Sequence, residues 1–138
     1  MLRNIGKSKR KNHTVRNKRA DIRKFEKQAD ALFQIRMKEK YPRSIVSGLP
    51  TEVIHHFVPK SQSNNLRYDE LNAIPLTNGE HFRHHNTSDP SVMVCAIKER
   101  GQKWADDLQI RRHIICKHTK EYLESVIEKL MDTKGLPF

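Results

Sequence analysis

Histidines are concentrated in one stretch of this chain, and their spacing restricts the folds that it can adopt. Five of the eight histidines lie between residues 55 and 85. His55 and His56 are adjacent in an apolar segment, and His81 and His85 lie four residues apart. Side chains at positions i and i+4 share one face of a helix, as two ligands of one ion must. A shared metal site would therefore require a fold that brings the two pairs together.

The segments around these histidines predict a ββα unit at about residues 51–87. The expected order is a strand at 51–59 (TEVIHHFVP), a polar loop at 61–70, a strand at 71–76 (LNAIPL), a turn at Asn78-Gly79 and a helix at 80–86. Successive side chains of a strand point to opposite faces. His55 and His56 therefore cannot both reach one ion, and a division into a ligand and a general base is expected.

Three other histidines carry weaker expectations. His84 lies about 100° around the helix from His85, and it is either a surface or DNA-facing residue or an alternative ligand. His113 and His118 are expected to be ordinary histidines on a helix surface.

Helical patterns flank the central unit on both sides. Apolar residues recur at helical spacing from Ala20 to Tyr41, and Pro42 ends that pattern. The C-terminal third predicts helices at Ser91–Arg100, at Gln102–Lys117 and from about His118 or Thr119. Whether the last helices fuse is left open. The expected fold class is α+β, with the central unit packed against the flanking helices.

The basic charge of the chain is concentrated near its N-terminus. The net charge is +11, and residues 1–24 hold ten Lys/Arg and one acid. We expect residues 1–19 to be a basic arm, disordered or ordered only on DNA, and 20–138 to form one domain, helical at 89–133 after the central unit. Such an arm suits a phosphate backbone, although a solvated tail would look similar.

The remaining composition indicates a cytoplasmic protein. No apolar run is long enough to span a membrane, and the N-terminus lacks the apolar segment of a signal peptide. Cys95 and Cys116 form no CxxC pair, so we expect two free thiols in a reducing compartment.

Residues 55–85, HHFVPKSQSNNLRYDELNAIPLTNGEHFRHH, resemble the HNH (ββα-metal) endonucleases, with spacing closest to that of the colicin-type DNases. The matching residues are His55, His56, Pro59, Asn72, His81 and His85. The sequence segments HHFVPKS, YDELNAIPL and HFRHH are also similar to those of phage recombination endonucleases of the Rap (NinG) kind. That second resemblance extends into GQKWADDL at 101–108.

The resemblance implies a role for each matching residue. His56 would be the general base, and Asn72 would brace the loop between the strands and orient that base. His55, His81 and His85 would hold one divalent ion: Zn, Mn, Ni or Mg. Imidazole favours the transition metals, whereas magnesium prefers oxygen ligands.

The resemblance also implies an activity, a substrate and partners. The activity would be hydrolysis of DNA phosphodiester bonds to 5′-phosphate and 3′-hydroxyl ends. Lys60, Arg67 and Arg83 flank the site as phosphate contacts, or are merely solvated charges. Branched or recombination DNA in a phage-infected bacterial cell is the expected substrate, on the phage resemblance alone. A homodimer would suit a two-fold symmetric junction.

Two departures from the family pattern affect these expectations. Many HNH proteins carry two CxxC pairs that bind a structural zinc, whereas Thr77 and Glu80 stand at two of those positions here. The acidic residue that commonly precedes the general base is His55, which favours ligation by three histidines. The alternatives are a nicking or non-specific DNase, and a non-catalytic DNA-binding protein with a structural metal site.

Overall fold

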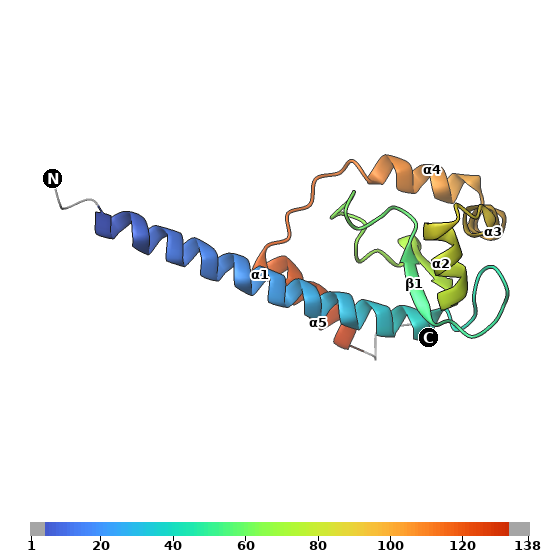
Figure 1. Cartoon of the computed structure of the whole chain (residues 1–138), viewed down its shortest axis with the longest axis horizontal. Coiled ribbons are helices and arrows are strands. Elements are labelled where there is room, and N and C mark those ends of the chain that lie inside the picture. Colours follow the sequence, from blue (N-terminus) through green and yellow to red (C-terminus); the bar gives the residue numbers. More distant parts are fainter. Residues whose placement is uncertain (1–4, 133–138) are drawn as a thin grey trace.

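The computed structural model of the chain describes residues 5–132, with side chains described from Val15 onward. Its elements are α1 (Ile5–Lys40), β1 (Val53–His56), the 3-10 helix η1 (Glu70–Asn72), β2 (Ala73–Leu76), α2 (Asn78–Asn86), α3 (Ser91–Arg100), α4 (Gln102–Arg111) and α5 (Lys120–Met131) (Figure 1). Within these residues the α+β class is confirmed, as five α-helices and a two-stranded antiparallel sheet. None of these helices has the length and apolar character of a membrane span.

The first helix is longer than the sequence pattern predicts. Its end at Lys40, two residues before Pro42, is confirmed within one residue. It begins at Ile5, however, so residues 5–19 are helical rather than disordered, and residues 1–4 lie outside the description. The stretch contains no proline, and lysine and arginine are good helix formers. A helix anchored at one end extends readily through such residues, because propagation costs far less than nucleation.

The sheet is short, and α1 completes one of its edges. β1 and β2 pair with Ile54 opposite Pro75 and His55 opposite Ile74. The outward backbone groups of Ile54 bond to the side-chain amide of Gln34, whose Nε2 donates to the Ile54 carbonyl at 2.9 Å and whose Oε1 accepts from its N–H at 3.0 Å. Gln34 thus occupies the place of a third strand and fixes α1 against the strand that carries His55.

The helix α2 begins earlier than expected. Thr77 caps its N-terminus, and the Thr77 hydroxyl accepts from the Glu80 N–H while the Glu80 carboxylate accepts from the Thr77 N–H. Asn78 and Gly79 therefore lie in the first helical turn, so the prediction of a separate turn there is wrong. This reciprocal pair is a capping box, which satisfies backbone donors that a helix N-terminus leaves free.

The C-terminal helices are separate, and one is shorter than predicted. α3 spans the predicted residues and ends at Gly101, whose φ of 93° favours glycine. α4 ends at Arg111 instead of Lys117, and residues 112–119 form a turn followed by an irregular connection to α5. Ile114 and Ile115 in this connection are exposed, so no core holds them in a helix.

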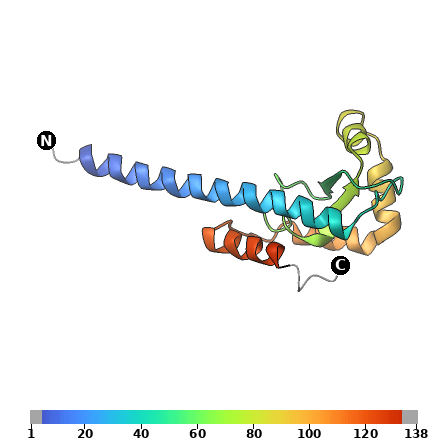
Figure 2. The ribbon, with the colours of Figure 1, turned by 90° about the horizontal axis from the view of Figure 1, so that it is seen from below.

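Two hydrophobic clusters hold these elements together. One lies between the sheet and the α3–α4 pair and includes Phe57, Val58, Leu66, Ile74, Leu76, Val92, Ala96, Ala105 and Leu108. The other joins α1, the sheet and α5 through Phe33, Met37, Ile54, Ala73 and Leu130. α5 lies alongside the C-terminal half of α1, whereas the N-terminal half of α1 projects beyond the body (Figures 1 and 2). Cys95 and Cys116 are free, as expected.

Candidate metal centre

Three histidines from two elements converge on one point. His55 comes from β1, while His81 and His85 lie one turn apart on α2. Their potential ligand atoms all lie within 4.8 Å of one another, and the two Nε2 atoms of His81 and His85 are 3.0 Å apart. The structure thus brings together the three residues expected to hold a metal.

The spacing and accessibility of these atoms suit a divalent transition metal. Two imidazole nitrogens bound to zinc at about 2.0–2.1 Å with tetrahedral geometry are about 3.3 Å apart, close to the observed pair. His55 is buried, His81 is half-buried and His85 is exposed, so the group opens to solvent on one side. Three protein ligands with an accessible side are typical of catalytic zinc sites, whereas structural sites have four protein ligands.

The electrostatic environment favours neutral imidazoles in this group. Burial, together with the neighbouring charges of His84, His81 and His85, lowers the pKa of His55 to about 3. Burial and the nearby His85 also lower the pKa of His81. Metal ligation needs the unprotonated nitrogen, so these shifts leave lone pairs available at neutral pH.

His84 lies beside the group without belonging to it. Its ring centroid is 4.9 Å from that of His55 and 5.2 Å from that of His85. Its Nδ1 atom is buried and has no hydrogen-bond partner among the described residues.

His56, the residue after His55 on β1, lines the same cavity as the three histidines. This cavity, of about 280 Å³, is lined by Gln34, Val53, Ile54, His55, His56, Pro59, Lys60, His81 and His85. The His56 ring stacks on Phe33 of α1 at 5.5 Å, and its Nε2 lies 2.8 Å from the Arg67 carbonyl oxygen. A carbonyl only accepts hydrogen bonds, so Nε2 carries the hydrogen and Nδ1 of the neutral ring keeps its lone pair.

The protonation of His56 reflects two opposing effects. Burial lowers its pKa and the hydrogen bond to the Arg67 carbonyl raises it, and the net result is a pKa below the ordinary value. The nearby Lys60 charge also lowers it. A neutral imidazole at pH 7 can accept a proton, which is the requirement for a general base.

The Arg67 side chain is held by two carboxylates of α1. It bonds Asp30 through Nε at 3.0 Å and Nη2 at 2.7 Å, and its Nη1 lies 3.0 Å from Glu26. Its side chain is only 16% exposed. These contacts weigh against the expected phosphate contact and make Arg67 a link between α1 and the residue that binds His56.

Asn72 occupies the centre of the loop between the strands. Its side chain is fully buried, with Oδ1 accepting from the Val58 N–H at 2.8 Å. Its Nδ2 donates to the carbonyls of Val58 and Leu66 at 3.0 and 3.1 Å. Asn72 thus ties both ends of the loop together just before the carbonyl of Arg67, and it does not line the cavity.

The two other expected phosphate contacts are exposed. Lys60 lines the cavity with a side chain 54% exposed, and its Nζ lies 4.0 Å from Asp30. Arg83 is on α2, and its Nε lies 3.8 Å from Asp89. Exposed ion pairs at such distances are weak. Both cations are therefore accessible to an anionic ligand.

Hydrogen bonds around Glu80 join the Ser44 loop to the start of α2. The carboxylate of Glu80 is buried and accepts from the hydroxyl of Ser44 as well as from the Thr77 N–H. Burial raises the pKa of Glu80, but these hydrogen bonds outweigh it and keep the pKa below its ordinary value. The Ser44 loop and the start of α2 are thus joined without thiolates.

The sequence pattern did not indicate that α1 contributes to the site, and the prediction for His118 is wrong. Phe33, Gln34 and Asp30 lie more than 20 residues before the histidines, and their α-helical spacing indicates only a shared face. His118 was expected on a helix surface. It lies instead in the connection before α5, stacked between Tyr68 and Tyr122 at 5.7 and 5.3 Å, with its side chain 4% exposed.

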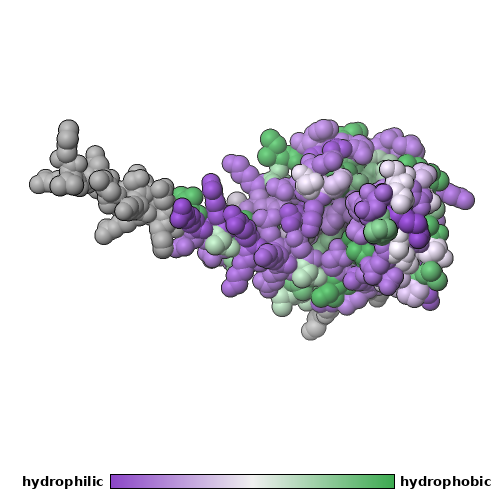
Figure 3. All heavy atoms as spheres, viewed as in Figure 1, coloured by the Kyte–Doolittle hydropathy of each residue, from purple (hydrophilic) through white to green (hydrophobic). Residues whose placement is uncertain are grey.

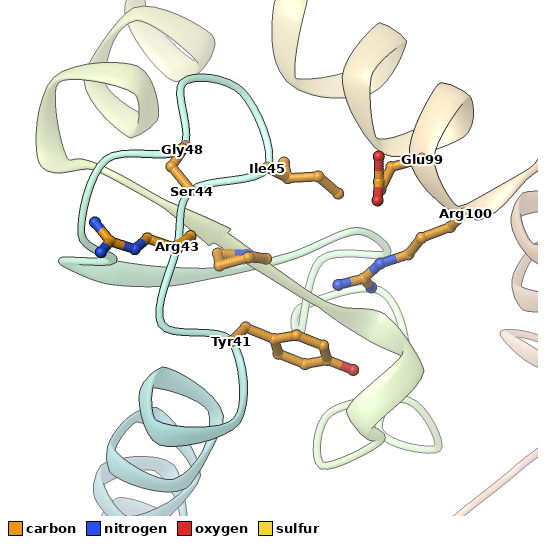
Figure 4. Close-up of a pocket in the computed structure, with 8 residues that line it drawn as sticks. Tyr41, Arg43, Ser44, Ile45, Gly48, Glu99 and Arg100 are labelled. Carbon is orange, nitrogen blue, oxygen red and sulfur yellow. The ribbon is translucent and has the colours of Figure 1, made fainter. Parts of the chain in front are cut away.

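A second hollow, of about 570 Å³, lies apart from the histidines. It is lined by Tyr41, Arg43, Ser44, Ile45, Gly48, Pro75, Glu99 and Arg100 (Figure 4). The Arg100 guanidinium reaches over the Tyr41 ring, 4.9 Å from its centroid. No group of metal-ligating side chains lines this hollow, so the chemistry of the described residues is concentrated at the histidine cavity.

Comparisons of the chain with protein-family models, curated proteins and solved structures find no match.

Proposed function

We propose that this chain is a metal-dependent DNA endonuclease of the HNH type, with its ββα-metal unit formed by β1, β2 and α2. One observation carries the proposal. Adjacent residues of a single strand supply a member of a three-histidine group and a separately held imidazole, and both line one cavity. That combination matches the two requirements of metal-assisted hydrolysis, which are a charge-stabilising ion and a positioned base.

The chain's own residues divide the work as follows. His55, His81 and His85 would hold the ion, which supplies positive charge against the negative charge of the phosphate and leaving oxygen. His56 accepts the proton of the attacking water at Nδ1, because Nε2 is committed to the Arg67 carbonyl. The stacked ring of Phe33 keeps the imidazole plane in place. A positioned base of this kind contributes about 10²–10⁴-fold in rate.

Charge supports DNA as the substrate. The exposed amino group of Lys60 lines the cavity, and Arg83 lies on the helix that carries two of the three histidines. The whole chain carries a net charge of +11, which favours a polyanion. We further propose branched recombination DNA as the substrate, on the resemblance to phage recombination endonucleases.

A plasmid assay with matched variants tests the proposal. Wild-type protein is incubated with supercoiled plasmid and Mg²⁺, Mn²⁺, Ni²⁺ or Zn²⁺, alongside His56→Ala and the exposed His113→Ala as a control. We expect cutting by wild type and His113→Ala, and a loss of about 10²–10⁴-fold in His56→Ala, which still binds metal. If wild type does not cut the plasmid with any of these ions, the endonuclease proposal is overturned, and a non-catalytic DNA-binding protein is favoured.

A panel of substrates tests the branched-DNA part separately. The same protein is given a four-way junction, a flap and a linear duplex of equal length. Faster cutting of the junction or flap supports a recombination substrate. Equal rates on all three favour a non-specific DNase.

A further inference from the structure

One face of α1 leads directly into the histidine cavity. Gln34 lines that cavity and bonds the backbone of β1, and Asp30 lies one turn before it, 4.0 Å from Lys60. In an α-helix, residues three or four apart follow one face. The residues that precede Asp30 on this face are therefore found by stepping back along α1 three or four residues at a time.

Four cations continue this face away from the cavity, at successive steps of four, four and three residues. They are Lys27, Arg23, Arg19 and Arg16. All four are exposed, and no ion pair is found for them within the described side chains. The one acid among residues 15–24, Asp21, points to another side of the helix. We call these four residues the basic stripe.

The acids nearest the basic stripe are paired with cations of the body. Glu26 and Asp30 both contact the guanidinium of Arg67, and Asp30 also lies 4.0 Å from Lys60. The four stripe cations therefore give the face of α1 from Lys27 outward a net positive charge. The N-terminal half of α1 projects from the body, and the side chains coloured there are mostly hydrophilic (Figures 1 and 3).

We propose that the basic stripe binds the phosphate backbone of a DNA duplex and guides it along α1 into the histidine cavity. The proposal rests on the endonuclease function and adds the direction and reach of the substrate. From Arg16 to Gln34 the helix rises about 27 Å, at 1.5 Å per residue. At 3.4 Å per base pair, that length corresponds to about eight base pairs on one side of the cut.

The chemistry of the stripe favours a polyanion over other partners. A helix that lies on a membrane needs an apolar face beside its cations, and a helix that docks in a protein groove needs apolar anchors at helical spacing. The stripe contains only cations, with Ala20 as its sole small apolar neighbour on the same face. A row of cations along a straight rod matches evenly spaced phosphates.

Two double variants with equal net charge test the stripe. Arg19→Gln/Arg23→Gln removes two stripe cations, whereas Lys18→Gln/Lys98→Gln removes two exposed cations outside the stripe. Lys18 lies about 100° or more around α1 from every stripe residue, and Lys98 lies on α3. Binding to a fluorescent 30-base-pair duplex is measured by anisotropy in EDTA at several salt concentrations. Circular dichroism checks that helix content is unchanged.

We expect the stripe variant to bind at least 10-fold more weakly than wild type, with a salt slope reduced by about one per cation removed. The control pair should lose clearly less of both. Equal losses in the two pairs would overturn the stripe, because only total charge would then matter. Binding to vesicles that contain phosphatidylserine is measured in parallel. If the stripe variant loses vesicle binding but binds DNA as well as wild type does, the proposal is overturned in favour of a membrane-binding surface.

The outcome remains separable from the proposed endonuclease. Binding is measured without metal, so it does not depend on cleavage. If wild type cuts plasmid but the stripe variant binds DNA normally, the stripe fails and the nuclease stands. If wild type never cuts but binds through the stripe, the nuclease fails, and the stripe is a DNA-binding surface without a catalytic site to feed.

Discussion

The Nε2 atom of His56 lies 2.8 Å from the backbone carbonyl oxygen of Arg67, and the two residues are eleven positions apart in the sequence. The side chain of Arg67 in turn bonds Asp30 and Glu26 of α1. A helix far upstream therefore fixes the position of the imidazole through a single arginine. Arg67 and Asp30 therefore influence the position of the His56 imidazole, although neither side chain is among those that line the cavity.

Replacing Arg67 should weaken both stability and cleavage. Arg67→Met leaves two carboxylates of α1 without their partner and frees the carbonyl that orients His56. We expect a loss of about 1–3 kcal/mol in the free energy of unfolding, measured in urea, and about 10–100-fold in cleavage rate. Arg43→Met, at an exposed position away from the histidine cavity, is the matched control. Normal cleavage by Arg67→Met would remove the positioning role.

Acid should weaken the contact between α1 and the loop. Burial raises the pKa of Asp30, but the hydrogen bonds and charge of Arg67, aided by Tyr68 and Lys60, outweigh it and hold that pKa below 3.8. The unfolded state then binds more protons near pH 4, so this stabilisation is complete above that pH and is lost as pH falls through the lower, folded-state pKa.

The Asp30 contribution is measured as the difference in unfolding free energy between wild type and Asp30→Asn. We expect that difference to be constant from pH 7 to about pH 5 and to shrink below about pH 4. Asp106→Asn, on α4, serves as the control. A difference that grows on acidification would contradict the sign of the shift.

Removing the amide of Asn72 should destabilise the loop between the strands. Asn72→Ala deletes three buried hydrogen bonds and leaves the Val58 N–H without its partner. We expect a loss of about 2–4 kcal/mol in thermal or urea unfolding. Asn86→Ala, at an exposed position near the end of α2, should change stability far less. A loss of stability no greater than that of Asn86→Ala would show that the loop keeps its conformation without the hydrogen bonds of Asn72.

Metal binding should depend on His55, His81 and His85. His85→Ala removes one of three donors, so we expect affinity for Mn²⁺ or Zn²⁺ to fall by more than the 10–100-fold typical of losing a supporting residue. Isothermal titration calorimetry measures the affinity, with the exposed His113→Ala as the control. Equal affinities in the two variants would exclude His85 from the site.

Metal should also stabilise the wild-type fold. An ion at 100 times its Kd adds about 2.7 kcal/mol to the free energy of unfolding. The melting temperature should therefore rise with added Mn²⁺ or Zn²⁺ and fall with EDTA, and His85→Ala should lose most of this response. His84→Ala run in parallel decides whether the buried Nδ1 of His84 contributes: a reduced response would make His84 a ligand.

The local elements of the site could be predicted from the sequence because they depend on short-range patterns. The apolar runs around His55 and Asn72 predicted the two strands, Pro42 and Gly101 marked helix ends, and the four-residue spacing placed His81 and His85 on one face. Alternation along a strand separated His55 from His56. These rules act over a few residues, so neighbouring sequence is enough to apply them.

The tertiary structure decided which distant residues support the site. Gln34 completes the edge of β1, Phe33 stacks on His56, and Asp30 grips Arg67, yet nothing near the histidines in the sequence indicates α1. The exposed Ile115 and the buried His118 likewise depend on where the chain between α4 and α5 crosses the body. Such contacts arise because burial and charge pairing act between surfaces in space, whereas sequence periodicity reports only the direction in which each side chain leaves its own element.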